Sequence, residues 1–300
     1  MVTRRTTLEE EILWREVMWA EMNQHPLWPD LPPAYLRDIG VYGGAAGIWR
    51  DAQNTSGVVP GGLAVSVLHT GKRYADDMDD DGIIYHYPTT DRSGGHDDSE
   101  VRSVKNAAIM QIPVFVISKS KKGRRVVRGW VSDHDDHHRL FLIEFTDQAR
   151  TGLAIEVDHS AFEISGRRRM REDQVLRAER SSRFKFEAIK RFDGKCAVTG
   201  LDVVEMLDGA HVVPVKNGGP DDPRNALLLS ASHHRAYDAH LWVVKPGTLE
   251  IVTRPDGPTL DRMKFKVNDL EHLADAGVLP HADALGRRFE LFEKSLKKAS

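Results

Sequence analysis

The residues with the clearest chemical potential lie between positions 196 and 244. His211 ends a short apolar run, Asn225 lies in a polar loop rich in glycine, and His234 opens a helix-like stretch that carries Asp238. Residues four apart share one face of a helix, so His234 and Asp238 are a natural pair of ligands for a divalent cation. His211, on the facing strand, is then free to act as a base on water. This combination predicts metal-assisted hydrolysis.

The whole pattern is more informative than any one histidine, because the chain has 14 histidines and a lone one is usually structural or solvent-facing. The pieces AHVVP, NGG, LLL and HHRAYD follow one another within a short span. Residues 184–245 thereby resemble the HNH nucleases, whose fold is a ββα-metal finger. The resemblance implies that His211, Asn225 and His234 are catalytic residues, with His211 as general base and Asn225 as a support for the loop. It also implies one divalent metal ion per chain (Mg, Mn or another transition metal), bound by His234 and Asp238.

Two positions depart from the pattern of that family. Ala210 stands where many members place a metal-binding Asp or His, which leaves the full ligand set open and makes Asp208 an alternative ligand. Cys196 is the only cysteine, so apolar packing replaces the paired cysteines that hold a structural zinc in many relatives. His233 is a weaker ligand candidate than His234, because its direction from the helix axis differs by about 100°.

A nuclease site of this kind needs a separate reader, because contacts to phosphate carry no sequence information. Residues 36–150 are the candidate. Their opening IGVYGGAAGIW and their run YADDMDDDGIIYHY resemble the SRA (YDG) domain, which recognises modified cytosine by flipping the base out of the duplex. The resemblance makes Tyr74 and Tyr87 the stacking aromatics of a modified-base pocket, and Asp77 the carboxylate that accepts from the cytosine amino group.

Several neighbours of that pocket have plainer explanations. Gly71 would let the backbone approach the base, whereas Tyr42, Gly43 and Gly44 match the opening motif of the SRA family and suit the fold or a backbone contact. Ile83, Tyr85 and Tyr87 alternate, so some of them must be core, and Tyr85 is the first choice for that role. The acidic run 76–81 fits either a solvated loop or a cation site.

Three histidines of the same region, His134, His137 and His138, suggest a second metal site at first sight. Their segment, SDHDDHHRL, lies between two strand-like runs. A polar hairpin turn is the favoured interpretation.

The elements that must position these residues can be read from hydrophobic periodicity. Residues 7–22 have a helical spacing of apolar residues, and Thr7 and Glu10 form the pattern of a capping box. A helix is also predicted over residues 97–111, and further helical stretches over residues 184–192, 231–241 and the C-terminal tail. Strands are predicted within residues 62–70, 82–88, 112–118, 125–133 and 139–145. The order predicts an α+β fold, with a curved-sheet, SRA/PUA-like reader domain followed by a ββα-metal HNH nuclease domain.

Changes in composition along the chain suggest its division. Residues 167–191 contain ten basic and four acidic residues, a local charge of +6. Such a stretch is either a solvated helix or a segment that follows DNA phosphates, with Arg167, Arg168, Arg169 and Lys185 as the candidate backbone contacts. The expected parts are an N-terminal helical segment (1–34), the reader domain (35–160), a basic linker or helix (161–183) and the nuclease domain with C-terminal helices (184–300).

Composition limits the class of protein. The 300 residues are 40% hydrophobic and carry a formal net charge of −3, which excludes a uniformly basic protein that coats nucleic acid. A single cysteine excludes an intramolecular disulfide framework. The sequence shows neither a signal peptide nor a membrane span, so a soluble cytoplasmic protein without a membrane partner is expected.

Together the two resemblances imply a modification-dependent restriction endonuclease. Its partner would be double-stranded DNA containing 5-methylcytosine or 5-hydroxymethylcytosine, and cutting both strands with one site per chain suggests a homodimer. One alternative is a modified-DNA-binding protein whose nuclease is weak or inactive. The other is an HNH nuclease that reads a different mark, such as N6-methyladenine or phosphorothioate, or only the shape of DNA.

Overall fold

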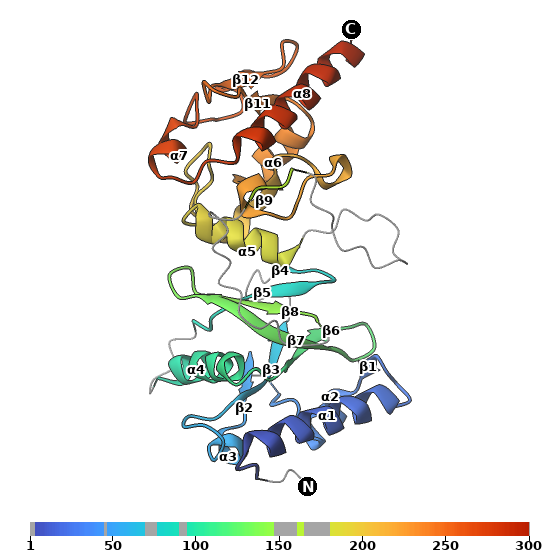
Figure 1. Ribbon diagram of the computed structural model, residues 1–300. Helices are drawn as coiled ribbons and strands as arrows, with labels where there is room; N and C mark the ends of the chain where they lie inside the picture. The colour runs from blue at the N-terminus through green and yellow to red at the C-terminus, as the bar shows by residue number, and fades with distance from the viewer. Residues whose placement is uncertain are drawn as a thin grey trace. The chain divides into compact units, whose positions relative to one another are not determined.

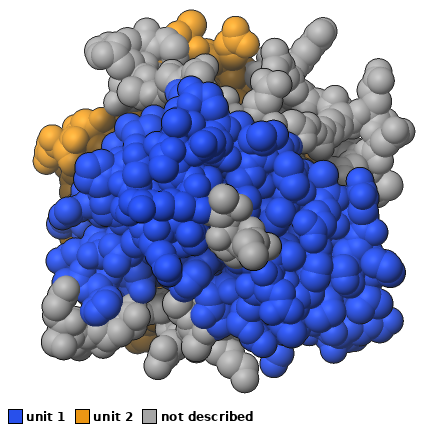
Figure 2. Space-filling model, turned by 90° about the horizontal axis from the view of Figure 1, so that it is seen from below, with its two compact units in different colours: residues 1–153 blue, residues 154–300 orange. Residues whose placement is uncertain are grey.

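The computed structural model describes residues 4–44, 47–69, 77–89, 95–146, 161–164 and 181–299. The chain divides into two compact units, residues 1–153 and residues 154–300 (Figures 1 and 2). Unit 1 combines a curved mixed sheet with helices, and unit 2 is built around a β-hairpin that leads into a helix. The predicted α+β fold class is therefore confirmed. In the part of the chain that the structure describes, no helix is both long and apolar enough to cross a membrane.

The sheet of unit 1 has eight strands among the described residues, in the order β2-β3-β6-β7-β8-β5-β4, with β1 paired to β7 beside this path. β3 and β6 are parallel, and the other pairs are antiparallel. Strands β3, β5, β6, β7 and β8 confirm the five predicted runs. The strands are β1 (Asp30–Leu31), β2 (Ile48–Arg50), β3 (Ala64–His69), β4 (Asp77–Met78), β5 (Gly82–His86), β6 (Val114–Lys119), β7 (Arg124–Asp135) and β8 (Leu140–Glu144).

Of the four helices that the structure describes in unit 1, α1 (Leu8–Gln24) and α4 (His96–Ile109) were predicted. The short helices α2 (Pro33–Asp38) and α3 (Ala52–Thr55) were not. The capping box at the start of α1 is present, because Thr7 accepts from the backbone N–H of Glu10 while the Glu10 carboxylate accepts from the backbone N–H of Thr7.

The central strands are apolar on both faces because each face of the sheet packs into its own core. Val114 and Val116 of β6 pack into the core that α4 covers. Phe115 and Ile117, which alternate with them, pack into the core that α1 and α2 cover. Successive side chains of a strand point to opposite faces, so a strand between two cores reads as a continuous apolar run.

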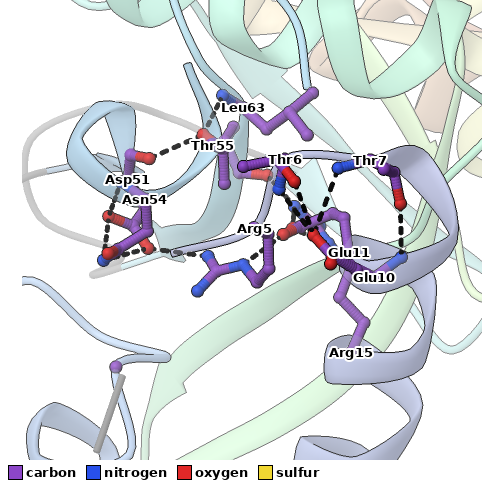
Figure 3. A network of polar contacts seen from close by, with 12 residues as sticks. Arg5, Thr6, Thr7, Glu10, Glu11, Arg15, Asp51, Asn54, Thr55 and Leu63 are labelled. Atoms are coloured by element: carbon purple, nitrogen blue, oxygen red, sulfur yellow. Dashed lines mark hydrogen bonds and ion pairs between the residues drawn. The ribbon is translucent and has the colours of Figure 1, made fainter. Parts of the chain in front are cut away.

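A buried ion-pair network attaches α1 to the rest of unit 1 (Figure 3). The Glu11 carboxylate accepts from Arg5 at 2.5 Å and from Arg15 at 2.8 Å. Arg5 also pairs with Asp51 at 2.7 Å. Arg15 donates to the backbone carbonyls of Ala64, the first residue of β3, and of Pro113, immediately before β6. Because each charge has a partner, the cost of taking these groups out of water is offset.

Two polar turns of unit 1 are hairpin connections. Asp79 closes the β4–β5 turn by accepting from the backbone N–H groups of Asp81 and Gly82, both at 2.8 Å. β7 ends at Asp135, whose carboxylate accepts from the backbone N–H groups of His137 and His138 before β8 begins. The prediction of a polar hairpin turn at these histidines is confirmed.

Unit 2 is arranged around the hairpin of β9 and β10, which continues directly into α6 (Figure 1). α5 packs against both strands of this hairpin, and α6 packs against them as well. The elements are α5 (Ser182–Arg191), η2 (Val204–Met206), β9 (Leu207–His211), η3 (Val215–Asn217), η4 (Pro223–Asn225), β10 (Ala226–Ser230), α6 (Ala231–Asp238), β11 (Trp242–Val244), β12 (Ile251–Thr253), α7 (Glu271–Asp275) and α8 (Ala282–Ala299).

Apolar packing holds the finger of unit 2 together. Phe186 of α5, Leu227 of β10 and Trp242 of β11 are completely buried. Cys196 is buried too, and its thiol accepts from the backbone N–H of Ser230 at 3.3 Å, immediately before α6. The single cysteine therefore serves as a small core residue that also contacts the start of this helix.

Candidate functional site

The β9–β10 hairpin and α6 place the predicted residues of unit 2 around one cavity. His211 is the last residue of β9 and lies opposite Ala226, the first residue of β10. β10 then runs into α6, which carries His234 and Asp238. The side chains of His211, His234 and Asp238 line a cavity of about 410 Å³. Asp208 from β9 and Lys185 from α5 line it as well. We call this cavity the unit 2 pocket.

His234 lies between two carboxylates in the unit 2 pocket. Its Nδ1 is 3.2 Å from Asp208, and its Nε2 is 3.4 Å from Asp238. The ion pair between His234 and Asp238 is present, and Asp208 is a second carboxylate beside the same ring. The two carboxylates lie at opposite nitrogens of the ring, and Asp208, His234 and Asp238 do not form a group of three close ligand atoms among the described residues. In this arrangement one cation can take the imidazole with only one of the two carboxylates, and both donor types suit Mg, Mn or Zn.

The strand geometry explains why Asp208 is the nearby carboxylate. Ala210, at the position where many HNH nucleases carry a ligand, is completely buried. Asp208 is two residues earlier and therefore on the same face of β9, the face that looks toward α6. Asp208 is only partly buried, so its carboxylate reaches the pocket where Ala210 has no donor to offer.

His211 is held from two directions. Its ring stacks on Phe184 of α5, with the centroids 3.8 Å apart and the planes 6° from parallel. Its Nε2 lies 2.8 Å from the carboxylate of Asp221. In the tautomer whose Nε2–H donates a hydrogen bond to Asp221, Nδ1 carries no proton and can accept one. Within the described residues, Nδ1 of His211 has no hydrogen-bond partner.

Gly209 allows α5 to approach closely enough for this stacking. A Cβ atom at Gly209 would lie 3.1 Å from the Cα of Lys185 and 3.4 Å from the Phe184 ring. Contacts this short would push α5 outward, and with it the ring that supports His211.

Asn225 is a scaffold for the loop that follows His211. Its side chain is completely buried and accepts from the backbone N–H of Val213 at 2.9 Å. Its amide nitrogen donates to the carbonyls of Val213 at 3.1 Å and Pro220 at 3.0 Å. Gly219 belongs to the same loop, and a Cβ there would lie 1.7 Å from the Val213 carbonyl oxygen. Asn225 thus fixes the backbone of this loop through three hydrogen bonds, and its role in catalysis stays a prediction.

His233, next to His234, points elsewhere and has both ring nitrogens engaged. Its Nδ1 is 2.7 Å from the Ser230 hydroxyl, and its Nε2 is 2.9 Å from the carbonyl of Met263. Burial lowers the pKa of His233, although the bond to Met263 works in the opposite direction. With a hydrogen bond at each ring nitrogen and a lowered pKa, His233 is a neutral, structural residue. Its side chain leaves the helix in a different direction from that of His234.

Cations line another part of the unit 2 pocket. Lys185, Lys216 and Arg288 are among its lining residues, with His240 near them. Arg288 is buried, donates to the carbonyl of Tyr237 and lies 4.0 Å from the centre of the Tyr237 ring. Burial, and then the charges of Arg288 and Lys216, lower the pKa of His240. The pocket therefore offers cations for a phosphate as well as ligands for a metal.

Sequence reasoning missed Asp221 and Arg288 and gave Asp208 only as an alternative. Asp221 contacts His211 through an irregular loop, whose path has no periodicity to read. Arg288 had a visible signal, because it lies on the apolar stripe of α8 with Leu285 and Phe292, both of which are buried. A charged residue on such a stripe calls for a specific partner.

The predicted reader residues of unit 1 are only partly within the described residues. Asp77 lies on β4 opposite Ile84 and is half-buried. Tyr87 is buried, its ring centre is 4.4 Å from that of Phe141, and its hydroxyl donates to Asp136 at 2.8 Å. Burial and this hydrogen bond raise the pKa of Tyr87.

Other residues of that region show what the fold requires of them. Tyr85 is buried in the core, as predicted. Gly43 packs so tightly that a Cβ atom would overlap the Trp49 ring at 1.9 Å. Several predicted residues lie outside the described residues: Gly71, Tyr74, Asp76 at the start of the acidic run, and Arg167, Arg168 and Arg169.

Comparison with known proteins classifies one segment of the chain. Residues 196–245, which contain His211, Asn225, His234 and Asp238, match the HNH endonuclease family. The predicted HNH segment is therefore confirmed over that range. None of the curated proteins compared with the chain matches it.

Solved structures with a similar course of the chain include the modification-dependent TagI restriction endonuclease. It is 19% identical, with a TM-score of 0.33, and the alignment covers 89% of this chain and 93% of TagI. The SUVH5 SRA domain in complex with hemi-methylated CG DNA is 20% identical, with a TM-score of 0.28, and covers 41% of this chain and 85% of that domain. The SUVH5 SRA domain bound to fully hydroxymethylated CG DNA is 19% identical, with a TM-score of 0.27, and covers 41% and 86%.

Proposed function

We propose that this protein is a modification-dependent DNA endonuclease. Unit 2 hydrolyses phosphodiester bonds with one divalent metal ion, and unit 1 reads 5-methylcytosine or 5-hydroxymethylcytosine as a flipped base. The observation that carries the nuclease part is the convergence of His211, His234, Asp208 and Asp238 on one pocket within the HNH segment. The reader part rests on the sequence pattern around Asp77.

The residues of the unit 2 pocket divide the chemistry among them. Nδ1 of His211 takes the proton of the attacking water as the water oxygen bonds to phosphorus and the bond from phosphorus to the leaving oxygen of the strand breaks. The Asp221 carboxylate stabilises the imidazolium that forms. Stacking on Phe184 keeps the ring in place. A divalent cation held by His234 with one carboxylate, Asp238 or in the alternative Asp208, would stabilise the negative charge that develops on phosphate and leaving oxygens.

The cationic part of the pocket has a complementary role. Lys185, Lys216 and Arg288 oppose the negative charge of the DNA strand and hold the scissile phosphate in reach of His211. Arg288 lies outside the HNH segment, on α8. The C-terminal helix thus contributes to the pocket as well as to the core of unit 2.

The proposed reader pocket depends on the carboxylate of Asp77 and on aromatic faces. Flipping a base exposes its amino group, and Asp77, half-buried on β4, is the acceptor in the proposal. Tyr87 is now packed on Phe141 and bonded to Asp136, so it would have to leave this position to stack on a base. Tyr74 is the proposed second aromatic.

The decisive experiment is digestion of matched plasmids that carry unmodified, 5-methylated or 5-hydroxymethylated cytosine. Each plasmid is incubated with Mg²⁺, Mn²⁺, Zn²⁺ or a chelator, and the His211→Ala protein is the matched inactive control. We expect metal-dependent cleavage of modified plasmids only. Binding of modified DNA without nicking in any metal would contradict the nuclease part of the proposal. Equal cutting of all plasmids would contradict the reader part.

Asp77→Ala tests the reader separately. The loss of the acceptor leaves the amino group of the flipped base unpaired, at a cost of about 1–3 kcal/mol, or roughly 5- to 150-fold in affinity for modified DNA. Affinity for unmodified duplex should change little, because it rests on phosphate contacts. An equal loss on both duplexes would mean that Asp77 supports the fold and that the mark is read elsewhere.

The proposal includes assembly as a homodimer. One nuclease site per chain cuts one strand, and a two-fold axis supplies the second site for the other strand. Sedimentation of the DNA complex at several protein concentrations tests this, and a single chain that still makes double-strand breaks would contradict it.

A further inference from the structure

The β6–β7 hairpin ends in a strongly basic tip, residues 119–125, which the mechanism above does not use. Its sequence, KSKKGRR, has five basic residues among seven and no acidic one. Lys119, Lys121, Lys122 and Arg125 are exposed. In the parts of unit 1 that the structure describes, none of these four side chains has an ion-pair partner.

The arginine farther along the same strand shows that this lack of partners is specific to the tip. Arg128 of β7 pairs with Glu16 of α1 at 2.8 Å and lies 5.4 Å from the ring centre of Trp19. Where an arginine of β7 packs against α1, an acidic residue neutralises it. The tip itself contains no acidic residue.

The backbone of the tip is fixed by short contacts. The Ser120 N–H donates to the Gly123 carbonyl at 3.2 Å, and the Gly123 N–H donates to the Ser120 hydroxyl at 3.0 Å. β1 pairs with β7 beside this turn, and a Cβ atom at Gly123 would lie 2.5 Å from the Leu31 carbonyl oxygen. The lysines thus project from an ordered backbone, so binding through them costs little backbone entropy.

Protection of a sheet edge does not explain the basic residues. Lysines often prevent edge strands from pairing with other chains, but β6 and β7 both lie inside the sheet order. The arrangement carries a cost, because Lys119 lies directly opposite Arg124 and like charges in that position repel. The register places one acidic residue nearby, Asp30 opposite Arg125. A bound polyanion would relieve the repulsion.

We propose that the tip formed by residues 119–125 binds the phosphate backbone of duplex DNA. Lysine and arginine side chains at such a tip neutralise neighbouring phosphates and release counterions, independently of the bases. This inference rests on the proposed function, because the tip would supply affinity for the duplex whose modified base unit 1 is proposed to bind. It assigns to β6 and β7 a DNA contact in addition to the basic stretch predicted at residues 167–191.

The test compares two full-length variants that lose the same charge. The tip variant carries Lys119→Ala, Lys121→Ala and Lys122→Ala. The control carries Arg4→Ala, Arg102→Ala and Lys294→Ala, three exposed positions spread over the molecule. The dissociation constant is measured for 5-methylated and unmodified duplexes over a range of salt concentrations.

For the tip variant we expect the slope of log affinity against log salt to become shallower by about 2–3, since each lost phosphate contact removes roughly 0.9. Affinity at low salt should fall about tenfold or more on both duplexes, so that the preference for modified DNA is unchanged. The control should change the slope by less than about 1. The melting temperature of the tip variant should stay equal to that of the native protein or rise, because like charges have been removed.

Native slope and affinity in the tip variant would overturn the inference. A fall in melting temperature that accounts for the lost binding would overturn it as well. A native protein that binds both duplexes equally would instead refute the proposed reading of a modification. A shallower slope in the tip variant would then still support the tip as a DNA contact.

Discussion

Unit 1 and unit 2 each contain a cluster of charged side chains, and the two clusters differ in exposure. In the unit 1 network, the side chains of Arg5, Glu11, Arg15 and Asp51 are 3%, 0%, 1% and 6% exposed. In the unit 2 pocket, the side chains of Asp208, His211, His234 and Asp238 are 19%, 15%, 15% and 56% exposed. Asp221, which contacts His211, is 28% exposed.

The comparison shows that pairing by itself does not indicate function. Both clusters consist of short contacts between acidic and basic groups. In the first, the charges are dry and satisfied by each other and by backbone carbonyls, which ties α1 to the sheet. In the second, the groups border a cavity and keep capacity for a further ligand. Exposure to a shared cavity distinguishes the chemical cluster from the structural one.

His211→Ala should give the largest effect and would break the comparison most directly. Cleavage of modified DNA should fall by about 10²–10⁴-fold, the loss typical for a general base. DNA affinity and melting temperature should stay near native, because His211 is partly exposed and borders the pocket. Single-turnover cleavage with purified variant measures the rate. A near-native rate would remove His211 from its proposed role.

Glu11→Gln should be the strongest destabilisation among the charged residues of unit 1. Removing one partner of a buried ion pair costs about 3–5 kcal/mol, and here two arginines lose charge compensation. Glu16→Gln is the matched control, since Glu16 pairs with Arg128 at the surface and should cost less than about 1 kcal/mol. Urea unfolding monitored by tryptophan fluorescence gives both values. Equal costs would show that burial does not separate the two pairs.

His233 and His234 sharpen the comparison within one helix. His234→Ala should weaken Mn²⁺ binding by more than the roughly 10–100-fold typical of outer-shell changes, with little loss of stability. His233→Ala should leave Mn²⁺ affinity unchanged and cost about 1–3 kcal/mol of stability, because Ser230 and Met263 lose a buried partner. Calorimetric titration and thermal unfolding measure the two properties. The reverse assignment of effects would exchange the roles of the histidines.

Asp221→Asn should lower the cleavage rate by about 10–100-fold, in the range of other changes that disturb the orientation of a functional histidine. DNA affinity should remain native, since Asp221 acts through His211. Asp222→Asn is the neighbouring control, because the Asp222 carboxylate pairs with Arg224, whereas Asp221 is the carboxylate bonded to His211. Similar losses of rate in both variants would indicate a general effect of the loop.

The sequence was sufficient for the longer elements and for the residues whose positions follow from regular spacing, but not for short elements such as α2, α3, β1 and β4. Strand alternation and helix periodicity place His211 at the end of β9 and His234 with Asp238 on one face of α6. Asp221 and Arg288 could not be located in this way. Their places depend on the path of an irregular loop and on the packing of a helix far along the chain.

Tyr87 illustrates a different limit. A core aromatic and an aromatic that stacks on a base are both apolar residues of a strand end, so the sequence pattern does not separate them. The structure adds contacts with Phe141 and Asp136 that the pattern does not contain. In exposure, the cluster of Tyr87, Lys105 and Asp136 is intermediate between the two charged clusters, since it combines a buried ring with an exposed carboxylate.

The smallest effect is expected from the acid titration of Asp136. Hydrogen bonds from Lys105 at 2.6 Å and from Tyr87 lower the pKa of this carboxyl below its ordinary value. A depressed folded-state pKa means that the stabilisation is present above the unfolded pKa of about 3.9 and is lost as the pH falls through the folded value. Asp136→Asn should therefore reduce stability near pH 7 by less than about 1 kcal/mol, because the carboxylate is largely exposed and its charge is screened by solvent. The stabilities of native protein and variant should converge between about pH 5 and pH 2. Urea midpoints of both proteins across this range test the prediction, with Tyr87→Phe as a second variant that loses one of the two bonds. A difference that stays constant down to the lowest pH would show that the charge of Asp136 does not contribute, and that Tyr87 is held by packing on Phe141 alone.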